Sequence, residues 1–140
     1  MEKVADKLTD MLVDHEGMRR KPYRCTAGKL TIGVGRNLDD RGISPDEAMY
    51  MLANDIKDAR RELSAAFPWF DKLDDVRQSV LIDMHVNLGL SRLQGFRNTL
   101  ALIGVGKYEA AAQEMLDSKW AEQVGRRAQR LSRMMATGRW

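Results

Sequence analysis

Cysteine is almost missing from this sequence, which has one thiol, at Cys25, and two histidines among its 140 residues. A single cysteine cannot form an internal disulfide, so the sequence excludes a small disulfide-stapled scaffold. The same shortage of thiol and imidazole ligands predicts no metal site, and we expect no cofactor. A chain of this length can bury a core of its own as one domain.

Long apolar runs are missing too. No stretch of about 18 or more apolar residues occurs, so we expect no membrane span and no stable membrane association. The first fifteen residues are amphipathic and charged throughout, whereas a secretory peptide needs a continuous apolar stretch. The sequence therefore predicts a protein that stays inside the cell that makes it unless another agent releases it.

Acidic residues are absent from one segment, residues 126–139, which contains five arginines. The ordinary interpretation of such a run is a solvated helix face. The alternative is attraction to a polyanion, either nucleic acid or bacterial wall. A formal net charge of +3 does not separate these two polyanions.

Apolar residues recur at helical spacing over residues 2–15, and Gly17 is the expected end of that helix. Glu16 then lies in or just beyond the last turn, where a carboxylate faces the unfavourable end of the helix dipole. Most glutamates at helix ends are surface residues. Here the position between an apolar helix and a hairpin predicts burial and favours the protonated acid, the form that a general acid needs.

Residues 22–36 change to a strand-like pattern. They predict a β-hairpin with its turn at Ala27–Gly28 and a short third strand near residues 34–38. Gly33 and Gly35 permit bends or a close backbone approach. A sheet this small is not stable alone, so helices must support it.

The remainder is helical. Ser44, Pro45 and Glu47 form a strong helix start, and the helix continues to about Ala66. Asp74 is the expected cap of the next helix and Gly89 its stop. Further helical segments are expected at 91–103, 107–117 and 125–135.

Glu16, Cys25 and Thr31 form the candidate chemical site. A lone cysteine is most often an inert core thiol, and a strand threonine usually has no chemical role. Residues on either side of a tight turn can point the same way, however. Cys25 and Thr31 are therefore expected to flank a cleft that Glu16 enters from the end of its helix.

This spacing resembles the signature of the phage-type lysozymes, the endolysins of glycoside hydrolase family 24. Eight residues separate Glu16 from Cys25, five separate Cys25 from Thr31, and IGVG follows. The middle position of the family is Asp or Cys. The segments LDDVRQSVLIDMHVNLG (73–89), GFRNTL (95–100) and 118–140 resemble the helical lobe of the family, so the resemblance covers nearly the whole chain.

The resemblance implies hydrolysis of the β-1,4 bond between N-acetylmuramic acid and N-acetylglucosamine in peptidoglycan. Glu16 would protonate the leaving oxygen, while Thr31 would hold the attacking water on the opposite face, with inversion at the anomeric carbon. Glycoside hydrolases usually use two carboxylates, and here the second is a thiol. Cys25 would supply negative charge if neighbours such as Arg24 lowered its pKa, position water if neutral, or form a covalent thioglycosyl intermediate. We favour water positioning together with Thr31.

The resemblance also implies substrate contacts in the cleft from five residues: Asn37, Val86, Asn87, Thr99 and Glu114. Glu114 differs in type from the family, which can have an amide there. Arg127 matches an arginine that can pair with the catalytic acid.

The implied fold is lysozyme-like α+β, in which a long helix joins a small three-stranded β-hairpin lobe to a larger helical lobe. Residues 1–140 would form one lysozyme-like domain. Its β lobe would span about 16–43, its connecting helix about 44–66, and its helical lobe about 67–140 together with helix 2–15, which should pack on that lobe.

The resemblance implies a monomeric endolysin with peptidoglycan as its partner. It would remain in the host cytoplasm until a holin releases it to the periplasm and cell wall, where the basic C-terminal segment could help it engage the anionic wall. One rival is a lytic transglycosylase or chitinase-like activity on the same scaffold. A less favoured rival is a non-enzymatic helical module that binds nucleic acid through residues 126–139. No aromatic stacking platform or recognition helix supports that module, so we expect no nucleic-acid partner.

Overall fold

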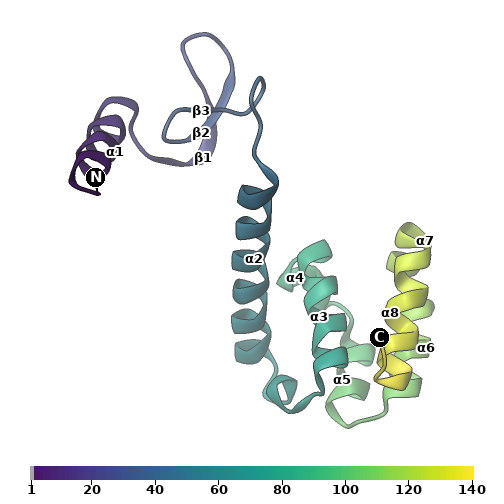
Figure 1. Cartoon of the computed structure of the whole chain (residues 1–140). Coiled ribbons are helices and arrows are strands. Elements are labelled where there is room, and N and C mark those ends of the chain that lie inside the picture. Colours follow the sequence, from purple (N-terminus) through teal and green to yellow (C-terminus); the bar gives the residue numbers. More distant parts are fainter. Residues whose placement is uncertain (1) are drawn as a thin grey trace. The chain divides into compact units, whose positions relative to one another are not determined.

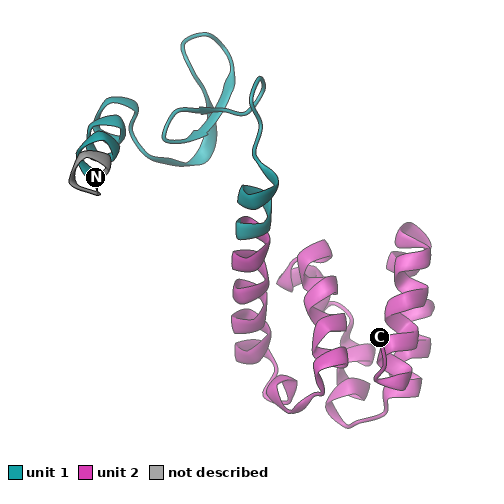
Figure 2. Ribbon diagram, in the orientation of Figure 1, with its two compact units in different colours: residues 1–50 teal, residues 51–140 magenta. Residues whose placement is uncertain are grey.

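The computed structural model describes residues 2–140, with side chains from residue 6 onward (Figure 1). The chain divides into two compact units, residues 1–50 and 51–140 (Figure 2). Helix α2 (Pro45–Ala66) begins in the first unit and continues into the second. The predicted α+β class is confirmed, because a small sheet is combined with a chain that is otherwise mainly helical. No helix among the described residues is long and apolar enough to cross a bilayer.

The first unit contains helix α1 (Glu2–Glu16) and an antiparallel sheet of three strands in the order β1-β2-β3. The strands are β1 (Arg19–Arg24), β2 (Leu30–Gly33) and β3 (Arg36–Asn37). The expected turn at Ala27–Gly28 is confirmed, since the Gly28 N–H donates to the Cys25 carbonyl at 2.8 Å. The short third strand is confirmed as well.

Helix α2 begins where the capping sequence predicts. The Glu47 N–H donates to the Ser44 hydroxyl at 3.1 Å, and the Ser44 N–H donates to the Glu47 carboxylate at 2.9 Å. These reciprocal bonds satisfy two backbone donors that a helix start otherwise leaves unpaired. The predicted end at Ala66 is also confirmed.

Glu47 also links the sheet to α2 through an ion pair with Arg36. The Arg36 guanidinium in β3 donates to both Glu47 oxygens, at 2.8 and 2.6 Å, and to the Gly42 carbonyl at 3.1 Å. Hydrogen bonds from Arg36, and then from the Ser44 backbone, lower the pKa of Glu47 to about 2. Hydrogen bonding to Glu47 raises the pKa of Arg36 in turn.

This pairing predicts a stability change in acid. Between about pH 4.5 and 2 the unfolded chain binds a proton at Glu47 that the folded chain does not. The stability that the ionised Glu47 contributes at neutral pH is therefore lost as the pH falls through this range. Glu47→Gln should be less stable than the parent at pH 7, and the difference in unfolding free energy should shrink towards pH 2. Thermal unfolding followed by circular dichroism at several pH values measures this difference. Asp55→Asn, on the same helix but outside the ion pairs of the described residues, is the matched control, and a pH-independent difference for Glu47→Gln would contradict the prediction.

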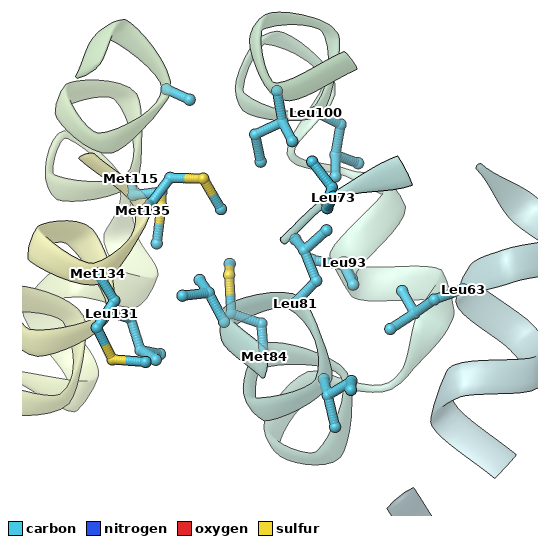
Figure 3. Packing of buried hydrophobic residues seen from close by; sticks show 14 of the residues in the cluster. Leu63, Leu73, Leu81, Met84, Leu93, Leu100, Met115, Leu131, Met134 and Met135 are labelled. Carbon is cyan, nitrogen blue, oxygen red and sulfur yellow. The ribbon is translucent and has the colours of Figure 1, made fainter. Parts of the chain in front are cut away.

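The second unit holds the hydrophobic core, whose buried apolar side chains all lie between Ala59 and Met135. Figure 3 shows Leu81 and Met84 of α3 (Asp75–Leu88) facing Met115 of α6 (Tyr108–Leu116) and Met135 of α8 (Arg126–Thr137). These side chains are at most 1% exposed, and burying each stabilises the fold by about 1.5–3 kcal/mol.

The helices between Gly89 and Gly125 differ in part from the prediction. Asp74 caps α3 through a 3.1 Å bond from the Arg77 N–H, and Gly89 follows its end, as expected. The segment predicted at 91–103, however, is two helices, α4 (Leu90–Gln94) and α5 (Arg97–Gly104). Two tight turns separate them, in which Gly95 N–H bonds to Arg92 and Phe96 N–H bonds to Leu93. The break lets Phe96 pack edge-on against Trp120, with ring centroids 5.9 Å apart.

Two short elements were not predicted. A turn of 3₁₀ helix, η1 (Phe70–Lys72), precedes α3, and helix α7 (Lys119–Val124) precedes α8. The Ser118 hydroxyl caps α7 by accepting the Ala121 N–H at 3.1 Å, and Gly125 follows its end. A serine cap before a short helix was therefore the signal available in the sequence. Whether α1 packs on the helical lobe concerns the arrangement of the two units and remains a prediction.

Candidate active site

Glu16 is the last residue of α1. The Gly17 N–H donates to the Val13 carbonyl at 2.7 Å, and Gly17 turns the chain with φ +75°, which confirms the predicted stop. The Glu16 side chain is exposed within the first unit. We expected the hairpin to bury Glu16, and within the first unit this was wrong. The hairpin residue next to the Glu16 carboxyl is Gly35, which has no side chain to cover it.

Gly35 is that neighbour. A β-carbon built on Gly35 would lie 2.7 Å from Glu16 Oε2 and 2.9 Å from Glu16 Cδ, closer than real β-carbons approach other atoms. Gly35 also has φ +68°, a left-handed conformation that residues with a β-carbon adopt only with strain. The backbone conformation of the turn between β2 and β3 therefore favours glycine, and a larger residue at position 35 would also move the carboxyl of the candidate acid.

Thr31 occupies the central strand, opposite Tyr23 of β1 and Asn37 of β3. It is 3% exposed, and its hydroxyl donates to the Lys29 carbonyl at 2.9 Å. Because the hydroxyl hydrogen is used inside the protein, the oxygen keeps lone pairs with which it can accept a hydrogen bond from a water molecule.

Cys25 lies beside Thr31 at the start of the hairpin turn. Hydrogen bonds from the Lys29 and then the Ala27 backbone lower the pKa of the thiol, and burial opposes them. The Thr31 hydroxyl lies near the sulfur, but its hydrogen is donated to the Lys29 carbonyl and not to Cys25. Arg24 is not among the groups that lower this pKa. The Arg24 guanidinium instead donates to the Gly28 carbonyl at 3.1 Å. The structure therefore brings the Cys25 and Thr31 side chains together, as the spacing predicts.

Asn37, the one predicted substrate contact in the first unit, is held by its own loop. Its amide donates to the Asp40 carboxylate at 3.0 Å and accepts the Asp40 N–H at 3.0 Å. A sugar would have to replace these bonds or contact another part of Asn37, and its role stays a prediction.

The other predicted contacts lie in the second unit. The side-chain oxygen of Asn87, Oδ1, accepts a hydrogen bond from the indole N–H of Trp120 at 2.9 Å. This bond holds the Asn87 side-chain amide next to a buried ring. Trp120, Thr99 and Glu114 all line one cavity of about 680 Å³. Sequence reasoning missed Trp120 because 33 residues separate it from Asn87.

Val86 and Arg127 line a different hollow, of about 370 Å³. Val86 is 47% exposed. Arg127 Nε donates to the Asp83 carboxylate at 2.7 Å, and a second bond reaches the Asp83 carbonyl at 3.3 Å. Asp83 is a partner of Arg127 that the sequence did not indicate. Pairing between Arg127 and Glu16 concerns the two units and stays a prediction.

Metal ligands do not gather in the described part of the chain. No group of three or more His, Cys, Asp or Glu side chains is placed there to hold an ion. The candidate site offers one carboxyl, one thiol of lowered pKa and one hydroxyl.

Comparisons with known proteins identify the family of this chain. A family model described as phage lysozyme matches residues 13–136. A probable T4-type lysozyme 2 of Dictyostelium discoideum is 27% identical, with 96% of each chain aligned. The pre-baseplate central spike protein Gp5 of Enterobacteria phage T4 is 25% identical over 94% of this chain and 28% of its own length. A SAR-endolysin of Haemophilus phage HP1 is 29% identical over 66% of this chain and 51% of its own.

Proposed function

Since this chain belongs to the phage lysozyme family, and is therefore a glycoside hydrolase, we propose that it is an endolysin that cuts one particular bond of bacterial peptidoglycan. The bond is the β-1,4 linkage between N-acetylmuramic acid and N-acetylglucosamine. The observation that carries the proposal is the seating of Glu16 against Gly35 in the unit that also pairs Cys25 with Thr31.

Glu16 is the general acid in this proposal. Its proton passes to the glycosidic oxygen as the bond to the anomeric carbon breaks, so the leaving sugar departs as a neutral hydroxyl. The absence of a side chain at Gly35 leaves room for the carboxyl at this position.

Thr31 and Cys25 position the water. The Thr31 oxygen accepts one hydrogen of the water, which turns a water lone pair towards the anomeric carbon. The Cys25 thiolate accepts the other hydrogen and takes the proton that the water loses on attack, and the lowered pKa of Cys25 increases the share of this anionic form relative to an ordinary cysteine. Direct attack on the face opposite the leaving group inverts the anomeric carbon.

Purified cell wall tests the function. The protein should clear a wall suspension and release ordinary reducing ends, identified by mass spectrometry, with the α anomer formed first. Anhydro ends would instead indicate a lytic transglycosylase, cleavage of chitin a chitinase-like activity, and a β anomer formed first a covalent intermediate. Absence of clearing would count against any wall enzyme.

Cys25→Ser should lower kcat/KM on cell wall about tenfold, because serine keeps a hydrogen bond but not an accessible anion. Cys25→Asp restores the carboxylate found elsewhere in the family and is the control, with activity at least equal to that of the parent. Unchanged activity in Cys25→Ser would contradict a role for the thiol in positioning water.

Release of the enzyme also belongs to the proposal. The endolysin stays in the host cytoplasm as a monomer until a holin opens the membrane, and then acts at the periplasm and cell wall without a nucleic-acid partner. Support for wall engagement comes from the basic end of the chain, where Arg126, Arg127 and Arg130 line a hollow of about 440 Å³.

A further inference from the structure

Cations gather on the first strand of the sheet. Residues 17–38 contain six Lys and Arg residues and no acid. Three of the six form ion pairs with acids at positions 39–47, and these are Arg24, Lys29 and Arg36. The other three are consecutive and exposed, and they form no ion pair with any side chain that the structure describes: Arg19, Arg20 and Lys21. Adjacent like charges repel one another, so the fold alone gains nothing from this cluster.

A bulge moves these cations out of the regular sheet. Between the paired residues Arg19 and Tyr23, β1 has three residues where β2 has one. A strand with extra residues bends and leaves them outside the hydrogen-bonded ladder. Residues 18–23, which we call the basic edge, line a hollow of about 560 Å³ at this bend.

Protection of the sheet edge does not account for the cluster. A charge, a bulge or a proline on an edge strand prevents pairing with a second sheet. Since β1 lies at the edge and already has the bulge and Pro22, which has no N–H to donate, three further cations are not needed for that purpose. An anionic partner is the better explanation of the unpaired charges.

The neighbours of the cations indicate what kind of anion this is. Met18 is 66% exposed, so an apolar side chain lies directly beside three charges. Tyr23 is the one aromatic residue of the basic edge, and the Arg19 guanidinium covers one face of its ring at 4.4 Å from the centroid. The basic edge therefore lacks a platform on which nucleic-acid bases can stack. A polar wall polymer, for its part, has no apolar phase for Met18.

We propose that the basic edge binds the surface of an anionic phospholipid membrane. Lipid phosphates would accept hydrogen bonds from Arg19, Arg20 and Lys21, while Met18 enters the apolar layer below the headgroups. The cytoplasmic face of a membrane has a negative surface potential that attracts Lys and Arg. Such attachment is reversible and weakened by salt, unlike that of a membrane span. It goes beyond the proposed hydrolysis, because it concentrates the protein at the membrane before release.

Vesicle sedimentation tests this surface. The whole protein should bind vesicles of equal parts phosphatidylglycerol and phosphatidylcholine, should not bind phosphatidylcholine alone, and should bind less as salt is raised. The triple variant Arg19→Gln/Arg20→Gln/Lys21→Gln should lower the partition coefficient about 100-fold, which is about fivefold for each cation. Met18→Ser should lower it about fivefold.

A matched triple variant separates this surface from net charge. Lys57→Gln/Lys72→Gln/Lys107→Gln removes the same charge from three separate exposed positions of the second unit and should keep the parent's partition coefficient. An equal loss in the two triple variants, or no binding by the parent, would overturn the proposal. Melting temperatures of both variants show that each is folded.

A measurement on the unsubstituted protein locates the contact. Spin-labelled lipid in the vesicles should broaden the amide signals of residues 18–23 and spare those of α8, the other basic segment. Broadening that is centred on α8 would overturn the proposal.

Two further assays distinguish other partners. Both triple variants should hydrolyse purified cell wall equally, since neither changes Glu16, Cys25 or Thr31. Loss of wall hydrolysis in the basic-edge variant alone would assign the cations to the wall and overturn the lipid surface. A lower affinity for a DNA oligonucleotide together with unchanged vesicle binding would overturn it in favour of nucleic acid.

The surface and the catalytic function fail separately. A parent that binds anionic vesicles but clears no cell wall would overturn the proposed function and support the surface. A parent that clears cell wall but binds no anionic vesicle would support the function and overturn the surface.

Discussion

Glu16→Gln should reduce hydrolysis of purified cell wall by about 10²–10⁴-fold, the usual contribution of a general acid. Glutamine has nearly the same shape and can keep the contact with Gly35, but it has no acidic proton to give to the leaving oxygen. Turbidity loss and the release of reducing ends, both normalised to protein, measure the change.

Stability separates this effect from misfolding. Glutamine removes a negative charge from the C-terminal end of α1, so Glu16→Gln should be as stable as the parent or slightly more stable. A loss of activity with no loss of stability is typical of a residue kept for chemistry. Glu122→Gln, on α7, is the matched control and should retain full activity. Parent-level hydrolysis by Glu16→Gln would overturn the assignment of the acid.

Gly35→Ala should cost about 1–2 kcal/mol of stability and lower kcat/KM on cell wall about 100-fold. The first effect is the strain of an alanine at φ +68°. The second arises because the new β-carbon would meet Glu16 Oε2 at 2.7 Å and displace the carboxyl from its seat. A displacement of about 1 Å at a catalytic group is enough for a change of this size.

Gly42→Ala is the control that separates the effect of displacing the Glu16 carboxyl from the effect of backbone strain. Gly42 has φ +66°, nearly the same as Gly35, and the nearest atom to its added β-carbon is the Leu38 carbonyl oxygen at 4.0 Å. The two variants should therefore have similar melting temperatures and very different activities. In the Glu16→Gln background, Gly35→Ala should cause little further loss, because both changes act on one proton donor. Equal activity in the two glycine variants would show that the Gly35 contact does not hold the acid.

Local signals in the sequence predicted local features of the structure. The Ser44–Glu47 pattern places the start of α2 correctly, because the reciprocal bonds that define it join residues three apart. The turn before Lys29 and the stop at Gly17 are also set by neighbouring residues. For the same reason the order of strands in the sheet follows from the hairpin pattern.

Contacts between distant residues were not predictable in this way. The partner of Asn87 is 33 residues away in Trp120, and the partner of Arg127 is 44 residues away in Asp83. The break between α4 and α5 goes together with the packing of Phe96 against Trp120, which no local pattern reports. The lowered pKa of Cys25 has backbone donors as its main cause, and sequence reasoning looks first for charged side chains.

The uneven distribution of buried side chains has a consequence for how this molecule tolerates mutation. Thr31 is the one buried residue among residues 6–50, whereas the apolar core lies wholly in the second unit. With each unit taken by itself, burial of apolar side chains stabilises mainly the second unit, whereas the candidate acid, thiol and hydroxyl lie in the first. Substitutions around those three groups should therefore have little effect on the stability of the core. Evolution or design can therefore vary the catalytic residues of this enzyme with little change in the stability of its core.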